Sequence, residues 1–225
     1  MQRFQDCIYK DICEIEQCKE ACMRYVEMSY MLKNSNIPKS KQKINSIIPE
    51  PCDDLAFEKL ADIRENIVNF INNGKSLYIY SSNCGNGKTT WSIKLMLQYF
   101  HEMWAGNGFT ERGIFIHVPT YLYDCKQNIT HGNDKFEHSR LMLPKVDLVI
   151  WDEIASTKLS EYDYTQLLVL INQRDLYEKA NIFTGNIKPN QLEQFVGSKL
   201  ASRILGECIQ IELKGGDRRG SITTA

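Results

Sequence analysis

The chain has 225 residues, of which 43% are hydrophobic and 24% charged, and its formal net charge is −1. This length allows one full-sized domain plus a small appendage, and the composition excludes a chain that is disordered throughout. The near-neutral charge means that any nucleic-acid binding needs a local basic surface. No apolar run is long enough for a membrane span or typical of a signal peptide, so we expect a cytoplasmic protein with no membrane partner.

Four of the eight cysteines lie in the first 22 residues, with the spacing C-x5-C-x4-C-x3-C: Cys7, Cys13, Cys18 and Cys22. Four thiolates this close can enclose one Zn²⁺, and metal ligation can hold together a segment too short for a core. We therefore predict that residues 1–33 form a separate zinc-binding module. Two alternatives stay open, an iron–sulfur cluster and an amphipathic helix whose thiols pack as small hydrophobic groups.

Residues 34–54 are rich in proline, lysine and polar residues, which is typical of a linker, and residues 55–225 are predicted to form the main domain. Apolar periodicity predicts strands that alternate with helices, which implies an α/β fold with a parallel sheet covered on both faces. The expected elements are a helix over 55–73, a strand over 76–81, a helix over 89–104, a strand over 113–118, a short helix over 119–129, a polar loop over 130–140, a strand over 146–151, a helix over 160–179 capped by Ser160, a strand over 180–186, one or two short helices over 188–205 and a strand over 208–213.

A glycine-rich turn between the first predicted strand and the next helix ends in Gly-Lys-Thr. A phosphate loop needs this strand-loop-helix order, because backbone N–H groups and the helix dipole then converge on the phosphates. The usual pattern G-x-x-x-x-G-K-[ST] fails only at its first glycine, where Ser82 stands. Lys88 is predicted to reach the phosphates and Thr89 to hold Mg²⁺. The predicted nucleotide-binding residues of this turn are Ser82, Asn83, Cys84, Gly85, Asn86, Gly87, Lys88, Thr89 and Thr90.

Polar residues follow two later strands. Asp152 and Glu153 end an apolar strand, where Asp152 can hold Mg²⁺ and Glu153 can polarise the attacking water. Asn186 ends the next strand and can orient that water. Arg203 lies in "LASRIL" near the C-terminus, and Arg219 lies in "GGDRRG" at the end of the chain. Simpler interpretations stay open for all of them. The two acids can be N-cap residues after a core strand, the asparagine can be a turn residue, and the arginines can be solvated surface charges.

The order of these motifs resembles that of AAA+ ATPases over about residues 55–220. Within that group the layout is similar to the bacterial and phage replicative-helicase loaders of the DnaC/DnaI type and to the IstB transposition ATPase. The segments that carry the resemblance are "SNIP" in the linker, "IFTGN" at the first sensor, "SRI" at the arginine finger and "GGDRR" near the end. Only 39 residues follow Asn186, too few for a helical lid, as in the loaders. The departures are Ser82 for glycine and Gly185 for serine.

The resemblance implies an ATPase with ATP and Mg²⁺ as cofactors, working as an ATP-dependent homo-oligomer. ATP would lie between subunits, with Arg203 reaching in from the neighbour and Arg219 acting as a second sensor. The implied partners are a hexameric replicative DNA helicase, docked on the cysteine-rich module, and single-stranded DNA. The short cysteine-rich N-terminus would suit a phage or prophage protein. The alternatives are an IstB-like transposition ATPase, an ATP-gated adaptor without productive turnover, and a zinc-binding interaction protein that is not an ATPase.

Overall fold

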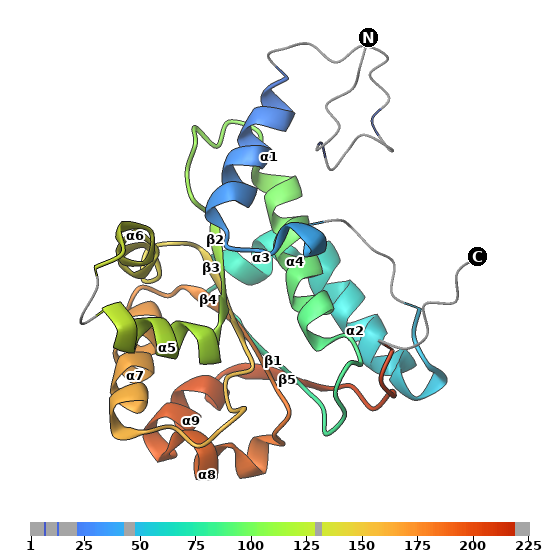
Figure 1. The fold of residues 1–225 in the computed structure, drawn as a ribbon. Helices are drawn as coiled ribbons and strands as arrows, with labels where there is room; N and C mark the ends of the chain where they lie inside the picture. The colour runs from blue at the N-terminus through green and yellow to red at the C-terminus, as the bar shows by residue number, and fades with distance from the viewer. Residues whose placement is uncertain (1–6, 8–12, 14–21, 43–47, 129–131, 219–225) are drawn as a thin grey trace.

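A five-stranded parallel sheet forms the centre of the molecule, in the strand order β2-β3-β4-β1-β5 (Figure 1). The computed structural model describes residues 7, 13, 22–42, 48–128 and 132–218. All five predicted strands are confirmed, and their carboxyl ends meet at one edge of the sheet. Their bounds are β1 (Ser76–Tyr80), β2 (Gly113–His117), β3 (Leu148–Asp152), β4 (Ala180–Gly185) and β5 (Cys208–Glu212).

Helices cover both faces of the sheet, as the alternating pattern predicts, and each face has its own hydrophobic cluster. On one face lie α1 (Met23–Asn34), α2 (Asp54–Glu65), α3 (Ile67–Asn72) and α4 (Lys88–Met103). The other face is covered by α5 (Val118–Asn128), α7 (Glu161–Leu176), α8 (Leu192–Val196) and α9 (Ser198–Leu205). Short 3-10 turns lie at Lys39–Lys41, Pro51–Asp53 and Pro189–Gln191.

Two local expectations were wrong. The single helix predicted over 55–73 breaks at Asn66, which leaves the helical conformation between α2 and α3 while the apolar spacing continues across the break. The segment predicted as a polar loop contains a helix, α6 (Asp134–Met142). The side chain of Asn133 caps α6 by accepting hydrogen bonds from the backbone N–H groups of Lys135 and Phe136. No residue of α6 is buried, so the helix leaves no apolar period in the sequence.

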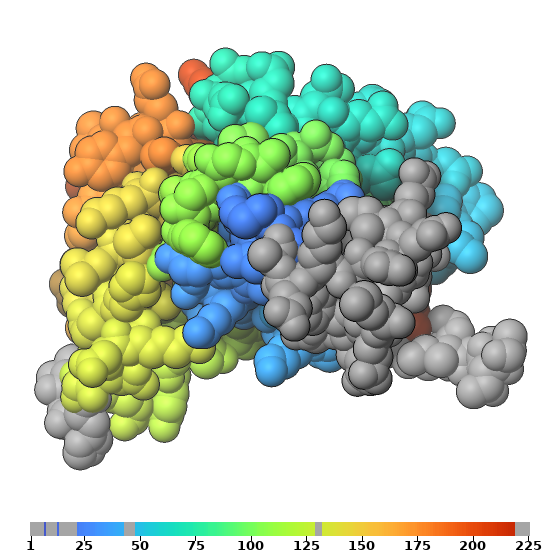
Figure 2. All heavy atoms as spheres, turned by 90° about the horizontal axis from the view of Figure 1, so that it is seen from above, coloured from blue at the N-terminus to red at the C-terminus, as the bar shows by residue number. Residues whose placement is uncertain are grey.

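Helix α1 packs against the end of α4 and the loop that follows it, and Figure 2 shows its blue surface beside the green surface of that region. The buried carboxylate of Glu27 accepts a hydrogen bond from the backbone N–H of Asn107 at 3.0 Å. Ser35 O accepts from Phe115 N at 2.7 Å, which occupies part of the open edge of β2. The later part of the predicted cysteine-rich module and the start of the predicted linker therefore contribute to the core of the main domain.

Candidate nucleotide-binding site

The predicted phosphate loop connects β1 to α4 at the carboxyl edge of the sheet. Gly85 and Gly87 have φ values of +70° and +103°, a conformation that side chains with a Cβ rarely adopt. Ser82 has no such φ value, so the position that departs from the usual pattern does not require glycine. The loop has the strand-turn-helix geometry that brings backbone N–H groups and a helix N-terminus to one point.

Lys88 is the first residue of α4, and the residue is 9% exposed. Its Nζ donates to Asn83 O at 2.8 Å and to Asn86 Oδ1 at 3.2 Å. Asn86 is buried and also donates through Nδ2 to Ser81 Oγ at 2.5 Å. The lysine is therefore held across its own loop, which places its charge at the N-terminus of α4.

Asp152 ends β3 and lies directly beside the loop, as predicted. Thr89 Oγ1 donates to Asp152 Oδ1 at 2.7 Å, and Thr184 Oγ1 donates to the same oxygen at 2.6 Å. Asp152 and Thr184 are 4% and 1% exposed, so water competes little for these hydrogen bonds. A hydroxyl and a carboxylate at this distance form an oxygen donor set that suits Mg²⁺.

Glu153 follows Asp152 and has a φ of +61°, an uncommon conformation for a non-glycine residue. Its N–H donates to Thr184 Oγ1 at 3.1 Å. Its Oε2 lies 3.3 Å from Nε2 of His117, the last residue of β2, while Nδ1 of the same imidazole lies 2.8 Å from Thr120 Oγ1. The turn thus aims the predicted water-polarising carboxylate along the edge of the sheet toward His117.

Asn186 follows β4 at the same edge of the sheet. Its Oδ1 is buried and has no hydrogen-bond partner within the described residues. Gly185 precedes it, and the structure shows why a larger residue does not fit there. A Cβ at Gly185 would lie 2.6 Å from the hydroxyl of Tyr78, which donates to Ile187 O at 2.7 Å.

The segment that follows β5 packs over the phosphate loop. Asn83 Nδ2 donates to Lys214 O and Gly215 O at 3.0 and 3.1 Å, and Arg218 N donates to Gly85 O at 3.1 Å. A Cβ at Gly85 would overlap the carboxylate of Asp217, so any larger residue here would have to displace that exposed side chain as well as adopt the φ of +70°.

The same C-terminal segment is held from its other side by residues that precede α2. Buried Asp53 accepts hydrogen bonds from Lys214 N and Gly215 N at 2.6 and 3.1 Å. The Arg218 guanidinium lies 3.4 Å from Asp53 Oδ2 and over the ring of Phe57. We call residues 213–218 the C-terminal strap; it joins the predicted linker to the phosphate loop.

Arg203 is not among the residues gathered at the loop. It lies on α9, is half-exposed, and forms an ion pair with Asp175 of α7 at 2.5 Å. Arg219, the predicted second sensor, lies outside the described residues, although its neighbour Arg218 is described as part of the strap.

The predicted zinc ligands are described only in part, because Cys18 lies outside the described residues. Cys7 and Cys13 pack against the hydrophobic cluster that contains α1, and Cys22 is the residue before α1. Within the described residues, no group of three or more His, Cys, Asp or Glu side chains is placed to hold a metal ion. In the same part of the chain, no helix has the length and apolar character needed to cross a membrane.

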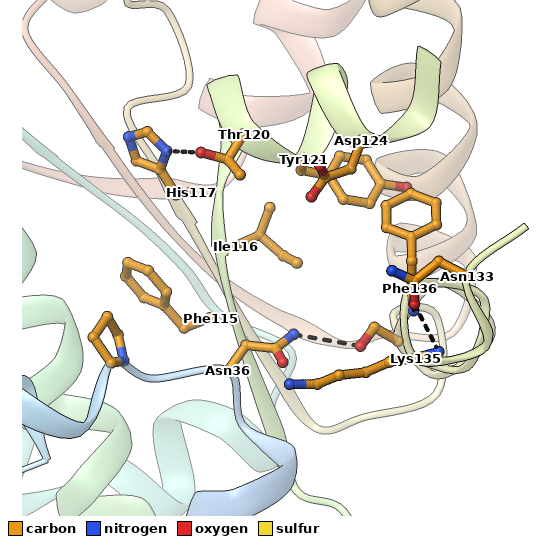
Figure 3. Close-up of a pocket in the computed structure, with 12 residues that line it drawn as sticks. Asn36, Phe115, Ile116, His117, Thr120, Tyr121, Asp124, Asn133, Lys135 and Phe136 are labelled. Atoms are coloured by element: carbon orange, nitrogen blue, oxygen red, sulfur yellow. Dashed lines mark hydrogen bonds between the residues drawn. The ribbon is translucent and has the colours of Figure 1, made fainter. Parts of the chain in front are cut away.

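A pocket of about 360 Å³ lies beside His117, between the open edge of β2 and helices α5 and α6 (Figure 3). Tyr121 and Phe136 stack at a centroid distance of 5.5 Å along one wall, and Asn36 faces them from the segment after α1. His117 therefore borders this pocket and also contacts Glu153.

The sequence interpretation missed three parts of the site: Thr184, His117 and the strap. Thr184 lies within the quoted segment "IFTGN", and His117 ends a predicted strand. The rule that parallel strands end at one edge could have placed both beside Asp152. The strap's hydrogen bonds with Asp53 have no comparable local signal, because the partners are separated by 161 residues or more.

No protein-family model and no curated protein matches this sequence. Solved structures do match. The structure described as the DnaC helicase loader has 17% identity and a TM-score of 0.62, with 75% of this chain and 94% of that chain covered. The DnaI structure has 18% identity and a TM-score of 0.63, with 82% and 95% covered.

A third structure is the replication initiator DnaA bound to AMPPCP and single-stranded DNA. It has 22% identity and a TM-score of 0.55, and the match covers 82% of this chain but 50% of DnaA. At these identities the comparisons bear on the fold. The strand order and these neighbours agree, and the chain has the same α/β fold as these three structures.

Proposed function

We propose that the protein is an ATP-dependent loader that delivers a hexameric replicative DNA helicase onto single-stranded DNA. The observation that carries the proposal is the hydrogen bond between Thr89 and Asp152 beside Lys88. It joins the phosphate loop to the acid-bearing strand in the arrangement that MgATP requires. The likeness to the DnaC helicase loader and to DnaI over nearly their whole lengths supports the loader role.

In this proposal the loop backbone and Lys88 bind the phosphates, and Thr89 and Asp152 hold Mg²⁺, which neutralises charge on the transferred phosphoryl group. Glu153 polarises the attacking water. Asn186, whose buried Oδ1 has no partner among the described residues, orients that water. The Glu153 carboxylate also contacts His117 at 3.3 Å, so the imidazole is placed to orient it.

The variant Glu153→Gln separates ATP hydrolysis from ATP binding, because glutamine keeps the shape of the side chain and removes its charge. We expect the variant to bind ATP as tightly as the wild type and to lose about 10²–10⁴-fold in turnover, the usual contribution of a general base. Equilibrium binding and steady-state phosphate release measure the two effects. Glu161→Gln, at the exposed start of α7, is the matched control and should change neither. Wild-type turnover by Glu153→Gln would contradict the assigned role.

The loader role is tested by whether the protein binds a hexameric replicative helicase in the presence of ATP and transfers it to single-stranded DNA. A co-purification assay with a transposase in parallel distinguishes the IstB-like alternative. Binding to the helicase without any dependence on ATP turnover would favour the adaptor alternative.

Arg203 is proposed to act on ATP bound to a neighbouring subunit, an effect worth about 10³–10⁵-fold in rate for arginine fingers. Its half-exposed position away from its own loop is compatible with action between subunits. Mixing Arg203→Ala with Lys88→Ala should restore part of the activity that each variant lacks. Normal hydrolysis by Arg203→Ala, with helicase and DNA present, would exclude this role.

We also propose that Cys7, Cys13, Cys18 and Cys22 bind one Zn²⁺. The purified protein should contain about one zinc per chain, and replacing these four cysteines by serine should remove the metal and the helicase contact. Cys52→Ser, at an exposed position before α2, is the control. Absence of zinc and iron from freshly purified protein would refute the proposal.

A further inference from the structure

Thr184 is the residue of β4 that touches both acidic residues of the site. Its Oγ1 lies 2.6 Å from Asp152 Oδ1 and 3.1 Å from Glu153 N. The last registered pair of the β3–β4 ladder is Trp151 with Phe183, so Asp152 and Thr184 are the residues immediately beyond it. We propose that Thr184 is a positioning residue that fixes the magnesium-binding carboxylate and the water-polarising glutamate relative to each other.

The two hydrogen bonds of the Thr184 hydroxyl have an assigned direction. An ionised carboxylate only accepts, so the single hydroxyl proton points to Asp152, and the length is typical of a charge-assisted O–H···O⁻ bond. An oxygen lone pair is then left to accept from Glu153 N. One buried hydroxyl therefore holds both the Asp152 side chain and the Glu153 backbone by hydrogen bonds.

The backbone of Thr184 takes part as well. Its carbonyl oxygen accepts a hydrogen bond from Ile154 N at 3.0 Å, so the two amides that follow Asp152 both donate to Thr184. Glu153 itself has a φ of +61°, a left-handed conformation that is strained for a residue with a Cβ. Thr184 supplies contacts that hold this turn, and the turn aims the Glu153 carboxylate.

The hydroxyls of Thr184 and Thr89 share one oxygen of Asp152, and they approach it from different elements, β4 and α4. In the proposed function Thr89 becomes a ligand of Mg²⁺. Thr184 then remains to orient the carboxylate, as the outer-shell partner of a metal ligand does. The inference rests on the proposed function, because it assigns Thr184 a role toward the same Mg²⁺ and water.

Three variants separate this role from a structural one. Thr184→Val keeps the volume and removes both hydrogen bonds, Thr184→Ser keeps the hydroxyl, and Thr184→Ala removes it without filling the space. Thr110→Val is the matched control, because the Thr110 hydroxyl donates to Asn107 O far from the loop. The affinity for a non-hydrolysable ATP analogue is measured by calorimetry with EDTA and with Mg²⁺, and turnover is measured across Mg²⁺ concentrations.

We expect Thr184→Val to bind the analogue normally in EDTA and to lose about tenfold in the Mg²⁺-dependent gain of affinity, as outer-shell changes do. Turnover at saturating MgATP should fall about 10–100-fold, with Thr184→Ser close to wild type and Thr110→Val unchanged. If Thr184→Val does not fold, Thr184→Ala must show the same loss.

The inference would be overturned if Thr184→Val kept both the Mg²⁺-dependent gain of analogue affinity and the wild-type turnover. Equal losses of affinity with EDTA and with Mg²⁺ would also overturn it, as would a Thr184→Ser variant without wild-type activity. A lower melting temperature alone, with normal Mg²⁺ dependence, would show a purely structural role. If the wild type itself does not bind MgATP, the proposed function fails, and this inference fails with it.

Discussion

Charged and polar residues lie at both ends of the parallel strands: at the amino edge, where the strands begin, and at the carboxyl edge, where they finish. The two edges differ in how the hydrogen-bonding groups of these residues are paired. At the amino edge, Asp147 accepts hydrogen bonds on both carboxylate oxygens, from Lys179 on Oδ1 and from Arg112 and Tyr99 on Oδ2. At the carboxyl edge, Thr89 and Thr184 both donate to a single oxygen of Asp152.

Arg174 illustrates the amino edge most strongly, because it is fully buried and yet surrounded by acceptors. Its guanidinium donates to the carbonyl oxygens of Leu143, Val146, Asp147 and Ala180 and to Asn181 Oδ1. Burial lowers the pKa of Arg174 to about 9, which still leaves it protonated at neutral pH.

At the carboxyl edge, by contrast, some polar groups are not fully paired within the protein. The Oδ1 of Asn186 is buried without a partner in the described residues, and the side chain of Glu153 is 44% exposed. Polar groups that the protein itself saturates stabilise the fold, whereas groups with capacity left over are available to a ligand. By this criterion the amino edge is structural, and the carboxyl edge is the candidate ligand site.

The largest expected effect is on the amino edge. Arg174→Met retains much of the volume but leaves several buried acceptors without their donor. We expect a loss of about 3–5 kcal/mol in the free energy of unfolding, the cost of removing one partner from a buried charged network. Urea denaturation measures it, and Arg64→Met on α2 is the control. A loss below about 1 kcal/mol would break the distinction between the edges.

The complementary effect is on the carboxyl edge. Lys88→Ala removes the charge from the phosphate loop, and we expect about 100-fold weaker ATP binding, since a hydrogen bond to a charged group contributes up to about 3 kcal/mol. Stability without nucleotide should change much less than in Arg174→Met. Calorimetry measures the affinity, with Lys94→Ala on the same helix as control. Unchanged ATP affinity would remove the phosphate-loop assignment.

The strands, their parallel arrangement and the phosphate loop could be predicted because each leaves a local pattern. Apolar runs mark the strands, and the Gly-Lys-Thr ending marks the loop even without its first glycine. Asp152 could be placed because an acid that ends a buried strand has a fixed position at the sheet edge. Ser160 was correctly predicted as an N-cap; its Oγ accepts from Asp163 N at 3.3 Å.

Other features depend on contacts that are distant in sequence. Arg174 looks like an ordinary helical charge, and only the fold brings the five acceptors around it. Helix α1 docks through Glu27 and Ser35 onto residues about 80 positions away. Helix α6 was missed for the opposite reason, because an exposed helix has no apolar period. Its cap Asn133 and the acids of its first turn were the available local signal.

A smaller effect is expected at the C-terminal strap, which belongs to the carboxyl edge. Asp53→Ala leaves the backbone N–H groups of Lys214 and Gly215 without their acceptor, and we expect a loss of about 1–2 kcal/mol in stability. Hydrogen exchange of these two amides should become faster, whereas amides of β3 should exchange as before. Asp54→Ala, at the neighbouring exposed position, is the control. Amides that stay protected in Asp53→Ala would mean that the strap is held by its contacts with the phosphate loop.

The smallest expected effect depends on pH and returns to the amino edge. Burial alone would raise the pKa of the Asp147 carboxyl, but hydrogen bonds from Arg112 and Lys179 and the charge of Lys179 outweigh burial and hold the pKa below its ordinary value. A carboxyl with a lowered folded pKa contributes stability above the unfolded value of about 4, and this contribution is lost as the pH falls through the folded value.

Asp147→Asn should therefore cost about 1 kcal/mol near neutral pH, and its difference from the wild type should shrink as the pH falls below about 4. Urea denaturation from pH 7 to pH 3 measures this, with Asp62→Asn on the exposed face of α2 as control. A difference that stays constant across this range would show that the Asp147 charge is not what its partners stabilise. The amino edge would then owe its stability to Arg174 and the backbone acceptors around it, and its contrast with the carboxyl edge would rest on hydrogen bonding rather than on charge.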